Sequence, residues 1–316
     1  MDKIAIIGAG LIGRAWAMVF ARAGHPVALY DADPGALAAN LAAIDASLAD
    51  LASAGLIDEP PAAVRERISA AATLEEALRD AAYVQENIRE TLEAKREIFA
   101  VMDRLAGPNC VLASSTSTIP ASAFTAALAG RARCLVVHPV NPPHLVPLVE
   151  LSPAPWTSPE TVERARALQT AAGQVPILVR KEIQGFILNR LQAALLNEAL
   201  ALYADGYASA EDIDKTVRDG LGLRWSFMGP FETIDLNAPG GVADYAARYG
   251  RVIQEQVATQ RPREWSPEVI GRLEAERRET LAAAELAGRE RWRDRRLMAL
   301  VAHKRAIAKD GSGASR

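Results

Sequence analysis

The 316-residue sequence is poor in cysteine and histidine, with two cysteines and four histidines. Cys110 and Cys134 do not form a C-x-x-C pair, and the histidines are scattered along the chain. A disulfide framework needs more cysteines, and a structural zinc site needs clustered sulfur and imidazole ligands. We therefore expect neither disulfide bonds nor a bound metal.

The chain also lacks an excess of positive charge and a long hydrophobic run. Acidic residues outnumber basic ones by 39 to 36, so no global positive field would attract a nucleic acid. No stretch of 18 uninterrupted apolar residues occurs, and the start of the chain does not have the pattern of a signal peptide. We expect a cytoplasmic protein that binds neither nucleic acid nor membrane.

Half of the residues are hydrophobic, and up to about residue 180 short β-type runs alternate with helical patterns. The first helical pattern, Leu11 to Ala23, places apolar side chains on one face and ends before Gly24. Asp33-Pro34 and the capping-box pair Thr73 and Glu76 mark two further helix starts. The alternation is typical of a doubly wound α/β sheet. The β-type runs are Ile4 to Ile7, Val27 to Tyr30, Tyr83 to Gln85, Val111 to Ala113, Leu135 to Val137 and Val175 to Val179.

After about Gly185 the alternation stops and the sequence is helical throughout. We therefore expect a Rossmann-type α/β domain over residues 1–184 and an all-helical domain over residues 185–316. The helical patterns of the second domain cover Phe186 to Ala204, Ser209 to Asp219 and Pro267 to Lys309. The last of them has an apolar stripe, which would dock on the same chain or on a partner subunit. This stripe consists of Trp292, Leu297, Leu300 and Val301.

The strongest local signal is Gly8-Ala9-Gly10-Leu11-Ile12-Gly13, which follows the first β-type run and opens the first helix. In such a pattern the first glycine permits a tight turn, the second lets a pyrophosphate approach the backbone, and the third lets the helix lie close to the sheet. The helix N-terminus presents free N–H groups to the phosphates. The pattern predicts a dinucleotide site, and a glycine-rich turn without a ligand is the alternative.

Asp31 supports the dinucleotide site, because it ends the second β-type run 18 residues after Gly13. A carboxylate at this place binds the ribose hydroxyls and would repel a 2′-phosphate. The sequence therefore favours NAD over NADP. FAD shares the glycine motif, and these residues alone do not distinguish it from NAD.

His138 ends an apolar run, at the edge of the sheet where α/β proteins bind their ligands. A proline-rich loop follows, and Glu150 ends another apolar stretch, so a returning loop would bring its carboxylate to the imidazole. This pair suits alcohol oxidation, since the imidazole accepts the hydroxyl proton while the carboxylate orients the ring. A hydrogen-bonded histidine without a catalytic role is the alternative.

Several ordered motifs together resemble the 3-hydroxyacyl-CoA dehydrogenase superfamily, over nearly the whole chain. They are the glycine loop, Ser114-Ser115-Thr116-Ser117-Thr118, His138-Pro-Val-Asn141-Pro, Glu150 and Gly185-Phe-Ile-Leu-Asn189-Arg190. Within the superfamily the chain is similar to the λ-crystallin branch, whose characterised activity is L-gulonate 3-dehydrogenase. This likeness continues through Gly222-Leu-Arg224-Trp225, Gly229-Pro-Phe-Glu232-Thr, Leu236-Asn237 and Trp292-Arg-Asp.

The resemblance implies roles for the matching residues of the reaction site. His138 would be the general base and Glu150 its partner, while Ser117 and Asn189 would hydrogen-bond the reacting oxygen or its neighbours. Without the resemblance, the preferred interpretation is a helix cap for Ser117 and an interior polar residue for Asn189.

The resemblance also implies NAD as the cofactor and a homodimer joined through the helical domain. Asn141 would lie near the nicotinamide, and Glu90 and Lys95 match positions that contact the cofactor. The alternative for Glu90 and Lys95 is a solvated ion pair. Residues 185–316 would then form a domain for substrate binding and dimerisation.

Arg224 distinguishes this chain from the acyl-CoA members of the superfamily, which lack the inserted Arg224 and Trp225. A guanidinium binds a carboxylate through two parallel hydrogen bonds, so we expect Arg224 to bind the free carboxylate of a small 3-hydroxy acid. An ion pair with Asp219 or Glu232 is the alternative. His144 departs from λ-crystallin relatives, which tend to have an aromatic residue after the two prolines, and we expect it to alter the substrate pocket.

The function expected from these features is NAD-dependent oxidation of L-gulonate to 3-dehydro-L-gulonate, or of a related small 3-hydroxy acid. Within the same chemistry, 3-hydroxybutyryl-CoA dehydrogenase and carnitine 3-dehydrogenase are alternatives. The run from Arg224 to Gly229 also resembles the carnitine enzymes. From a different class, a non-catalytic crystallin-like protein that binds a dinucleotide remains a further alternative.

Overall fold

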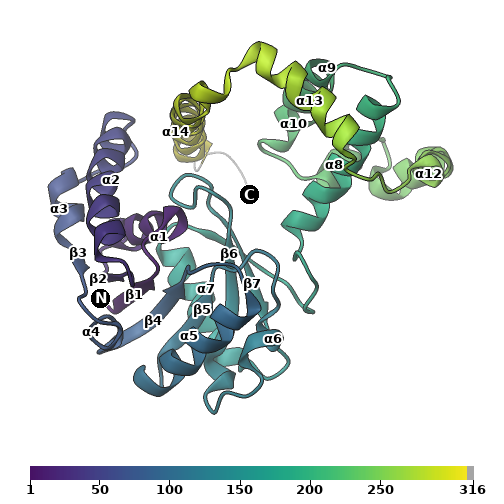
Figure 1. The fold of residues 1–316 in the computed structure, drawn as a ribbon. Helices are drawn as coiled ribbons and strands as arrows, with labels where there is room; N and C mark the ends of the chain where they lie inside the picture. Colours follow the sequence, from purple (N-terminus) through teal and green to yellow (C-terminus); the bar gives the residue numbers. More distant parts are fainter. Residues whose placement is uncertain (312–316) are drawn as a thin grey trace. The chain divides into compact units, whose positions relative to one another are not determined.

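The computed structural model describes the backbone of residues 1–311 and the side chains of residues 1–307. These residues form two compact units, which are described separately. The first comprises Met1–Asn189 together with residues 290–311, and the second comprises Arg190–Arg289. A Rossmann-type sheet with helices on both faces makes up the first unit, and helices make up the second (Figure 1). The predicted fold class is therefore confirmed.

The sheet of the first unit has eight strands in the order β3-β2-β1-β4-β5-β6-β7-β8. Neighbouring strands run parallel, except that β7 is antiparallel to β6. The sequence did not predict β3 and β7 as strands. The strands are β1 (Lys3–Ile7), β2 (Val27–Tyr30), β3 (Ile68–Ala70), β4 (Ala81–Glu86), β5 (Val111–Ser114), β6 (Cys134–Pro139), β7 (Leu148–Pro153) and β8 (Val175–Leu178).

Helices cover both faces of this sheet, so alternate side chains of each inner strand enter two separate cores. In β1, Ile4 and Ile6 belong to one core with α1, α2 and α7, whereas Ala5 and Ile7 belong to the other with α4, α5 and α6. The helices of this unit before residue 189 are α1 (Leu11–Arg22), α2 (Pro34–Ser53), α3 (Pro61–Glu66), α4 (Leu74–Leu78), α5 (Leu92–Leu105), α6 (Ala121–Thr125), α7 (Pro159–Ala171) and the start of α8 (Leu188–Ala204); a 3-10 turn covers Arg131–Arg133.

The helix starts that the sequence predicts have the expected caps. The Asp33 carboxylate accepts a hydrogen bond from the Gly35 N–H at 2.8 Å and starts α2, and the Thr73 hydroxyl accepts from the Glu76 N–H at 3.1 Å and starts α4. Gly24, after α1, has a φ of +88°, which favours glycine.

α2 is long and apolar enough to cross a membrane, by length and composition alone. In the structure it is a helix of the α/β unit, and one of its faces is buried in the core around α1. The buried side chains are Leu37, Ile44, Leu48 and Leu51.

α14 (Leu286–Gly311) differs from the expectation that residues 185–316 form one helical domain. From Glu290 onward it packs with the α/β unit. Met298 is buried in the core of that unit, and Leu297 and Val301 pack against the same core. The apolar stripe thus docks partly on its own chain, while Trp292 and Leu300 are 38% and 44% exposed.

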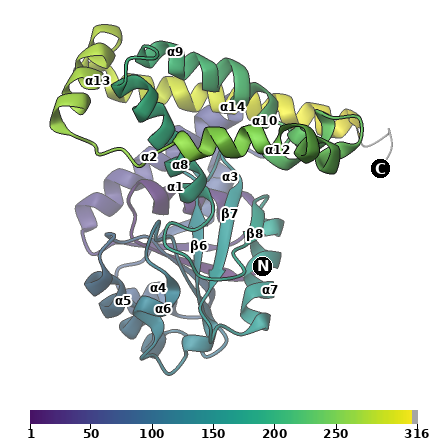
Figure 2. The same ribbon diagram turned by 90° about the vertical axis from the view of Figure 1, so that its right-hand side faces the viewer.

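The helical unit consists of the greater part of α8 and the helices up to the beginning of α14 (Figure 2). The pattern from Pro267 to Lys309 forms two helices rather than one, because the chain leaves the helix at Leu281. The helices are α9 (Ala210–Lys215), α10 (Gly222–Trp225), α11 (Pro230–Leu236), α12 (Gly241–Thr259) and α13 (Pro267–Thr280), with a π turn at Thr216–Leu221 and a 3-10 turn at Ala283–Glu285.

Candidate active site

His138 and Glu150 form a buried pair at the end of β6. The two residues are register partners across the antiparallel strands β6 and β7. The Nδ1 of His138 lies 2.8 Å from Oε2 of Glu150, and the two residues are 4% and 0% exposed. The ring of Phe186 packs on the imidazole with ring centroids 5.3 Å apart. The predicted proximity is thus present: the loop of residues 140–147 returns the chain, and β7 carries Glu150 back alongside β6.

The other oxygen of Glu150 is held by the backbone that precedes α8. Its Oε1 accepts hydrogen bonds from the N–H groups of Ile187 and Leu188 at 2.9 and 3.0 Å. Gly185 and Phe186 have φ angles of +75° and +50°, and this left-handed turn presents the two N–H groups to the carboxylate. Phe186 in this conformation also explains why α8 begins at Leu188 and not at residue 186, as the sequence predicts.

The hydrogen bonds of Glu150 determine its charge state. Burial alone would raise the pKa of the carboxyl, but the hydrogen bonds from His138, Leu188 and Ile187 outweigh burial and lower it. Glu150 is therefore an anion that fixes the imidazole with its Nδ1–H toward the carboxylate, and Nε2 is the nitrogen left to accept a proton.

The glycine turn has the geometry that a dinucleotide requires. A Cβ on Gly8 would lie 2.8 Å from the Asn87 carbonyl oxygen, and a Cβ on Gly13 would collide with the Gly8 carbonyl, so packing requires both glycines. A Cβ on Gly10 would meet nothing within 4 Å. Gly10 is therefore not required by packing, and its missing side chain leaves space for a pyrophosphate. No side chain caps α1, whose first residues Leu11 and Ile12 offer backbone N–H groups.

Asp31 directly follows β2 and faces the glycine turn. Its Oδ2 accepts a hydrogen bond from the Ala9 N–H at 2.7 Å, and its Oδ1 accepts one from the Asp33 N–H at 3.0 Å. These bonds fix a half-buried carboxylate beside the turn. The glycine turn, the uncapped helix and Asp31 together fit NAD.

Ser117 and Asn189 lie together, although the contact is not the expected one through the hydroxyl. The Asn189 side-chain Nδ2 donates to the Ser117 carbonyl oxygen at 2.8 Å. Ser117 is exposed and does not cap α6, since Pro120 is the cap residue and no side chain caps that helix. Asn141 is exposed in the loop between β6 and β7.

Glu90 is not part of a solvated pair, because it organises the turn that contains Ser117. One of its oxygens, Oε1, accepts from the Thr116 hydroxyl at 2.5 Å and from the N–H groups of Ser117 and Thr118 at 2.8 and 3.1 Å. The Lys95 ammonium lies 3.8 Å from the other oxygen, Oε2. Glu90 thereby holds the Ser117 backbone that Asn189 contacts.

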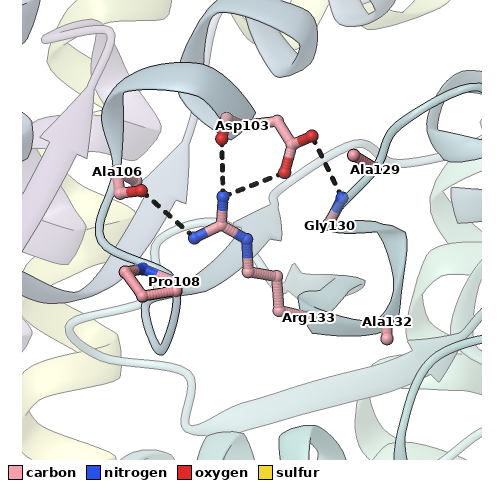
Figure 3. Close-up of a pocket in the computed structure, with 7 residues that line it drawn as sticks. All are labelled: Asp103, Ala106, Pro108, Ala129, Gly130, Ala132 and Arg133. Atoms are coloured by element: carbon pink, nitrogen blue, oxygen red, sulfur yellow. Dashed lines mark hydrogen bonds and ion pairs between the residues drawn. The ribbon is translucent and has the colours of Figure 1, made fainter.

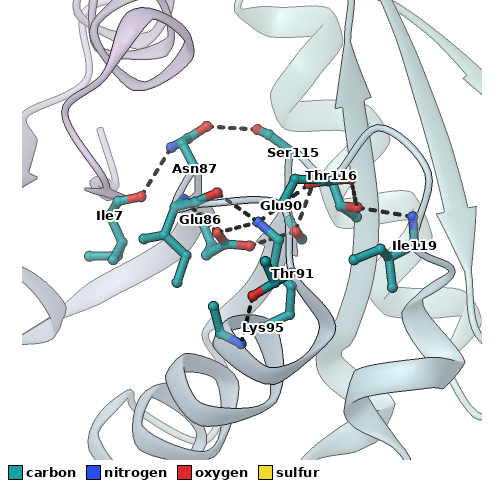
Figure 4. Close-up of polar contacts among 12 residues, drawn as sticks. Ile7, Glu86, Asn87, Glu90, Thr91, Lys95, Ser115, Thr116 and Ile119 are labelled. Atoms are coloured by element: carbon teal, nitrogen blue, oxygen red, sulfur yellow. Dashed lines mark hydrogen bonds and ion pairs between the residues drawn. The ribbon is translucent and has the colours of Figure 1, made fainter.

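Lys95 belongs to a buried network that the sequence did not reveal. It is 1% exposed and donates to Glu86 at 2.7 Å and to the Ile88 carbonyl at 3.0 Å (Figure 4). Glu86 ends β4, is fully buried and also accepts from the Ser114 hydroxyl at 2.5 Å. One sequence signal could have identified Glu86 as a site residue. It directly follows the β-type run Tyr83 to Gln85, and ligands bind at the edge of the sheet where such strands end.

Arg224, in α10 of the helical unit, is exposed and makes no ion pair with a described residue. Of its two expected internal partners, Asp219 pairs instead with Arg218 at 2.7 Å, and Glu232 makes no ion pair with a described residue. The guanidinium is therefore available to an external carboxylate.

A cavity of about 360 Å³ near the end of α5 is structural rather than a binding site (Figure 3). Arg133, one of its lining residues, donates to the carbonyl and the carboxylate of Asp103 at 2.7 and 2.9 Å, and to the Ala106 carbonyl at 3.4 Å. The second carboxylate oxygen of Asp103 accepts from the Gly130 N–H. The Arg133 guanidinium thus stabilises the packing of its own unit.

Two family profiles match consecutive parts of the chain. Residues 3–183 match the "3-hydroxyacyl-CoA dehydrogenase, NAD binding domain", and residues 185–280 match the "3-hydroxyacyl-CoA dehydrogenase, C-terminal domain". The chain is 41% identical to the lambda-crystallin homolog of Bos taurus over 96% of either protein. It is 36% identical to the L-carnitine dehydrogenase of Pseudomonas putida, over 95% of this chain and 93% of the relative.

Among solved structures, the chain is similar to 5-formyl-3-hydroxy-2-methylpyridine 4-carboxylic acid 5-dehydrogenase, which is described as an NAD⁺-dependent dismutase. The TM-score is 0.82 at 26% identity, over 98% of this chain and 99% of the other. The sequence matches, the glycine turn with Asp31 and the two-unit fold agree with one another. The chain therefore belongs to the 3-hydroxyacyl-CoA dehydrogenase family and is an NAD-dependent oxidoreductase similar to the λ-crystallins.

Proposed function

We propose that the chain oxidises a small free 3-hydroxy acid, with L-gulonate as the substrate and 3-dehydro-L-gulonate as the product. The observation that carries this proposal is the buried His138–Glu150 pair, with 2.8 Å between Nδ1 and Oε2. It provides an imidazole oriented to take up a proton from a substrate hydroxyl. Bound NAD supplies the hydride acceptor.

In the proposed reaction, Nε2 of His138 accepts the proton of the 3-hydroxyl group. The positive charge that develops on the imidazole is stabilised by Glu150, which remains ionised because three hydrogen bonds hold it. Ser117 lies on the turn held by Glu90, with a hydroxyl that has no hydrogen bond to a described residue, and it is free to bind the substrate oxygen.

Arg224 supports a free acid over a thioester as the substrate. Its exposed guanidinium has no acidic partner among the described side chains, and a guanidinium matches the geometry of a carboxylate. The higher identity to the lambda-crystallin homolog, 41% against 36% for the L-carnitine dehydrogenase, favours L-gulonate over L-carnitine.

We also propose that the protein is a homodimer joined through its helical unit. None of the residues of α12 is buried, although the helix has an apolar face. On it Tyr249, Val252 and Val257 are 46%, 51% and 56% exposed, and on α11 Phe231 is 80% exposed. Large exposed apolar side chains of this kind are typical of a protein interface, and the same unit of a second copy provides a matching surface.

The proposed function is tested by measuring NADH formation with L-gulonate, L-carnitine and 3-hydroxybutyryl-CoA in parallel. We expect the highest kcat/KM with L-gulonate, and the loss of roughly 10² to 10⁴ in rate in His138→Ala. A preference for either other substrate would refute the substrate assignment. Tight NAD binding without turnover of any 3-hydroxy acid would instead favour the non-catalytic, crystallin-like alternative.

A further inference from the structure

A second cavity, away from the dinucleotide turn, lies between α1, the loop that joins β6 to β7, and α14. Its volume is about 380 Å³, which is within the range of small-molecule sites. All residues that line it belong to the α/β unit. No step of the proposed reaction uses them.

One end of this cavity is basic. Arg22 and Arg305 both donate to the Leu56 carbonyl oxygen, at 3.1 and 3.0 Å, so two guanidinium groups converge on one acceptor. Neither guanidinium forms an ion pair with a carboxylate of a described residue. Asp58 is the acidic group whose charge raises the pKa of Arg22. Burial, and after it the charge of Arg305, lower the pKa of Arg22 to about 10. Two like charges held together in this way are stabilised by a bound anion.

His144 and Gln174 add polar atoms to the same cavity. His144 Nδ1 and Gln174 Oε1 are buried and have no hydrogen-bond partner among the described residues. Burial, and after it the charge of Arg22, lower the pKa of His144 to about 4, so its ring is neutral near pH 7. Buried polar atoms without partners are costly, and a polar ligand would satisfy them.

The remaining walls of the cavity are apolar. Val19 of α1, Leu145 of the loop, and Leu297, Leu300 and Val301 of α14 line it. An inorganic anion would leave this surface without a contact, whereas an aliphatic chain would bury it.

We propose that this cavity binds a small organic anion, namely a carboxylate on a short apolar chain. The carboxylate binds between Arg22 and Arg305, and the chain packs against the leucine and valine side chains of α14. His144 therefore contributes to this second site and not to the substrate pocket that its place in the sequence suggested.

The test is calorimetric titration of the full-length protein with hexanoate. We expect saturable binding, weakened at least tenfold by Arg305→Met, because that substitution removes one of the two guanidinium groups. Arg295→Met is the matched control, since Arg295 lies exposed on the same helix and outside the cavity, and we expect no change there. Leu300→Trp, which fills the apolar end at a half-exposed position, should also weaken binding.

Three results would overturn this proposal. Equal affinity of folded Arg305→Met and the unmodified protein would remove the basic end from the site. Equal binding of hexan-1-ol or of inorganic phosphate would show that the carboxylate or the chain is not recognised. Loss of hexanoate binding in Arg224→Met would place the probe in the substrate site, independently of whether L-gulonate is turned over.

Discussion

His138 and Glu150 face each other across β6 and β7, the one antiparallel pair among the described strands of the sheet. Register partners in an antiparallel pair extend their side chains from the same face. The loop of residues 140–147 reverses the chain between these two strands and thereby places the carboxylate beside the imidazole. Glu150 is fixed from its other side by Ile187 and Leu188, so β6, β7 and the start of α8 meet at this one carboxylate.

Glu150→Gln should inactivate the enzyme while leaving its shape intact. The amide oxygen must accept from the N–H groups of Ile187 and Leu188, so the amide NH₂ faces Nδ1 of His138. Nδ1 must then be the unprotonated nitrogen, and the proton moves to Nε2, which can no longer act as a base. We expect kcat to fall by about 10²- to 10⁴-fold. Steady-state assays should show an unchanged KM for NAD, and a nearly normal kcat would contradict the assigned tautomer.

The same carboxylate should make the fold sensitive to acid. The folded-state pKa of Glu150 lies below its ordinary value of 4.5, so its contribution to stability is complete above that pH and is lost as the pH falls through the folded-state pKa. Urea unfolding of the unmodified protein and of Glu150→Gln between pH 6 and 3 measures this contribution. We expect the difference in unfolding free energy to shrink with acid. A difference that stays constant or widens would contradict it.

The parts of the site that depend on local sequence were predictable. Gly8, Gly10, Gly13 and Asp31 act through a turn, a helix start and a strand end, and each of these has a sequence pattern of its own. β7 was missed because Pro147 precedes it and Pro153 is its last residue, and prolines within a run argue against a strand. A strand of three residues, such as β3, is too short to show a period.

The buried ion pair of Glu86 and Lys95 shows where sequence reasoning stops. From sequence alone, charged residues are predicted to be solvent-exposed unless a partner is known. The partner of Glu86, Lys95, comes from a different element. The ring of contacts around Glu90 was missed for the same reason, since Thr116 and Ser117 reach it from beyond β5. The return of α14 to the α/β unit likewise depends on tertiary packing, because an apolar stripe does not specify its partner.

Asp31 should set the preference for NAD over NADP. Asp31→Asn keeps an oxygen that can accept from the Ala9 N–H but removes the charge that repels a 2′-phosphate. We expect the ratio of kcat/KM for NAD to that for NADP to fall at least tenfold. Asp50→Asn, at an exposed position on α2, is the control with the same charge change. An unchanged ratio in Asp31→Asn would assign the preference to another residue.

Val252→Glu should convert the proposed dimer to a monomer. Val252 is 51% exposed on the apolar face of α12, where a buried carboxylate in an interface would have no partner. Ala247→Glu is the matched control, because the helical repeat places Ala247 on the opposite side of α12. Light scattering after size-exclusion chromatography gives the mass of each variant. If both variants remain dimeric, the interface lies elsewhere.

Arg224→Met should weaken the binding of the acid substrate without affecting the cofactor. Methionine retains much of the apolar length of arginine but cannot donate to a carboxylate, and a hydrogen bond between charged groups contributes about 1.5–3 kcal/mol. We therefore expect KM for the hydroxy acid to rise about 10- to 100-fold, with KM for NAD unchanged. Arg218→Met tests whether any nearby positive charge is sufficient for substrate binding. Arg218 pairs with Asp219 at 2.7 Å, so we expect this substitution to change KM little. Equal rises of KM in both variants would indicate a general electrostatic attraction and not a specific contact with Arg224. No rise of KM in Arg224→Met would place the substrate carboxylate at another residue.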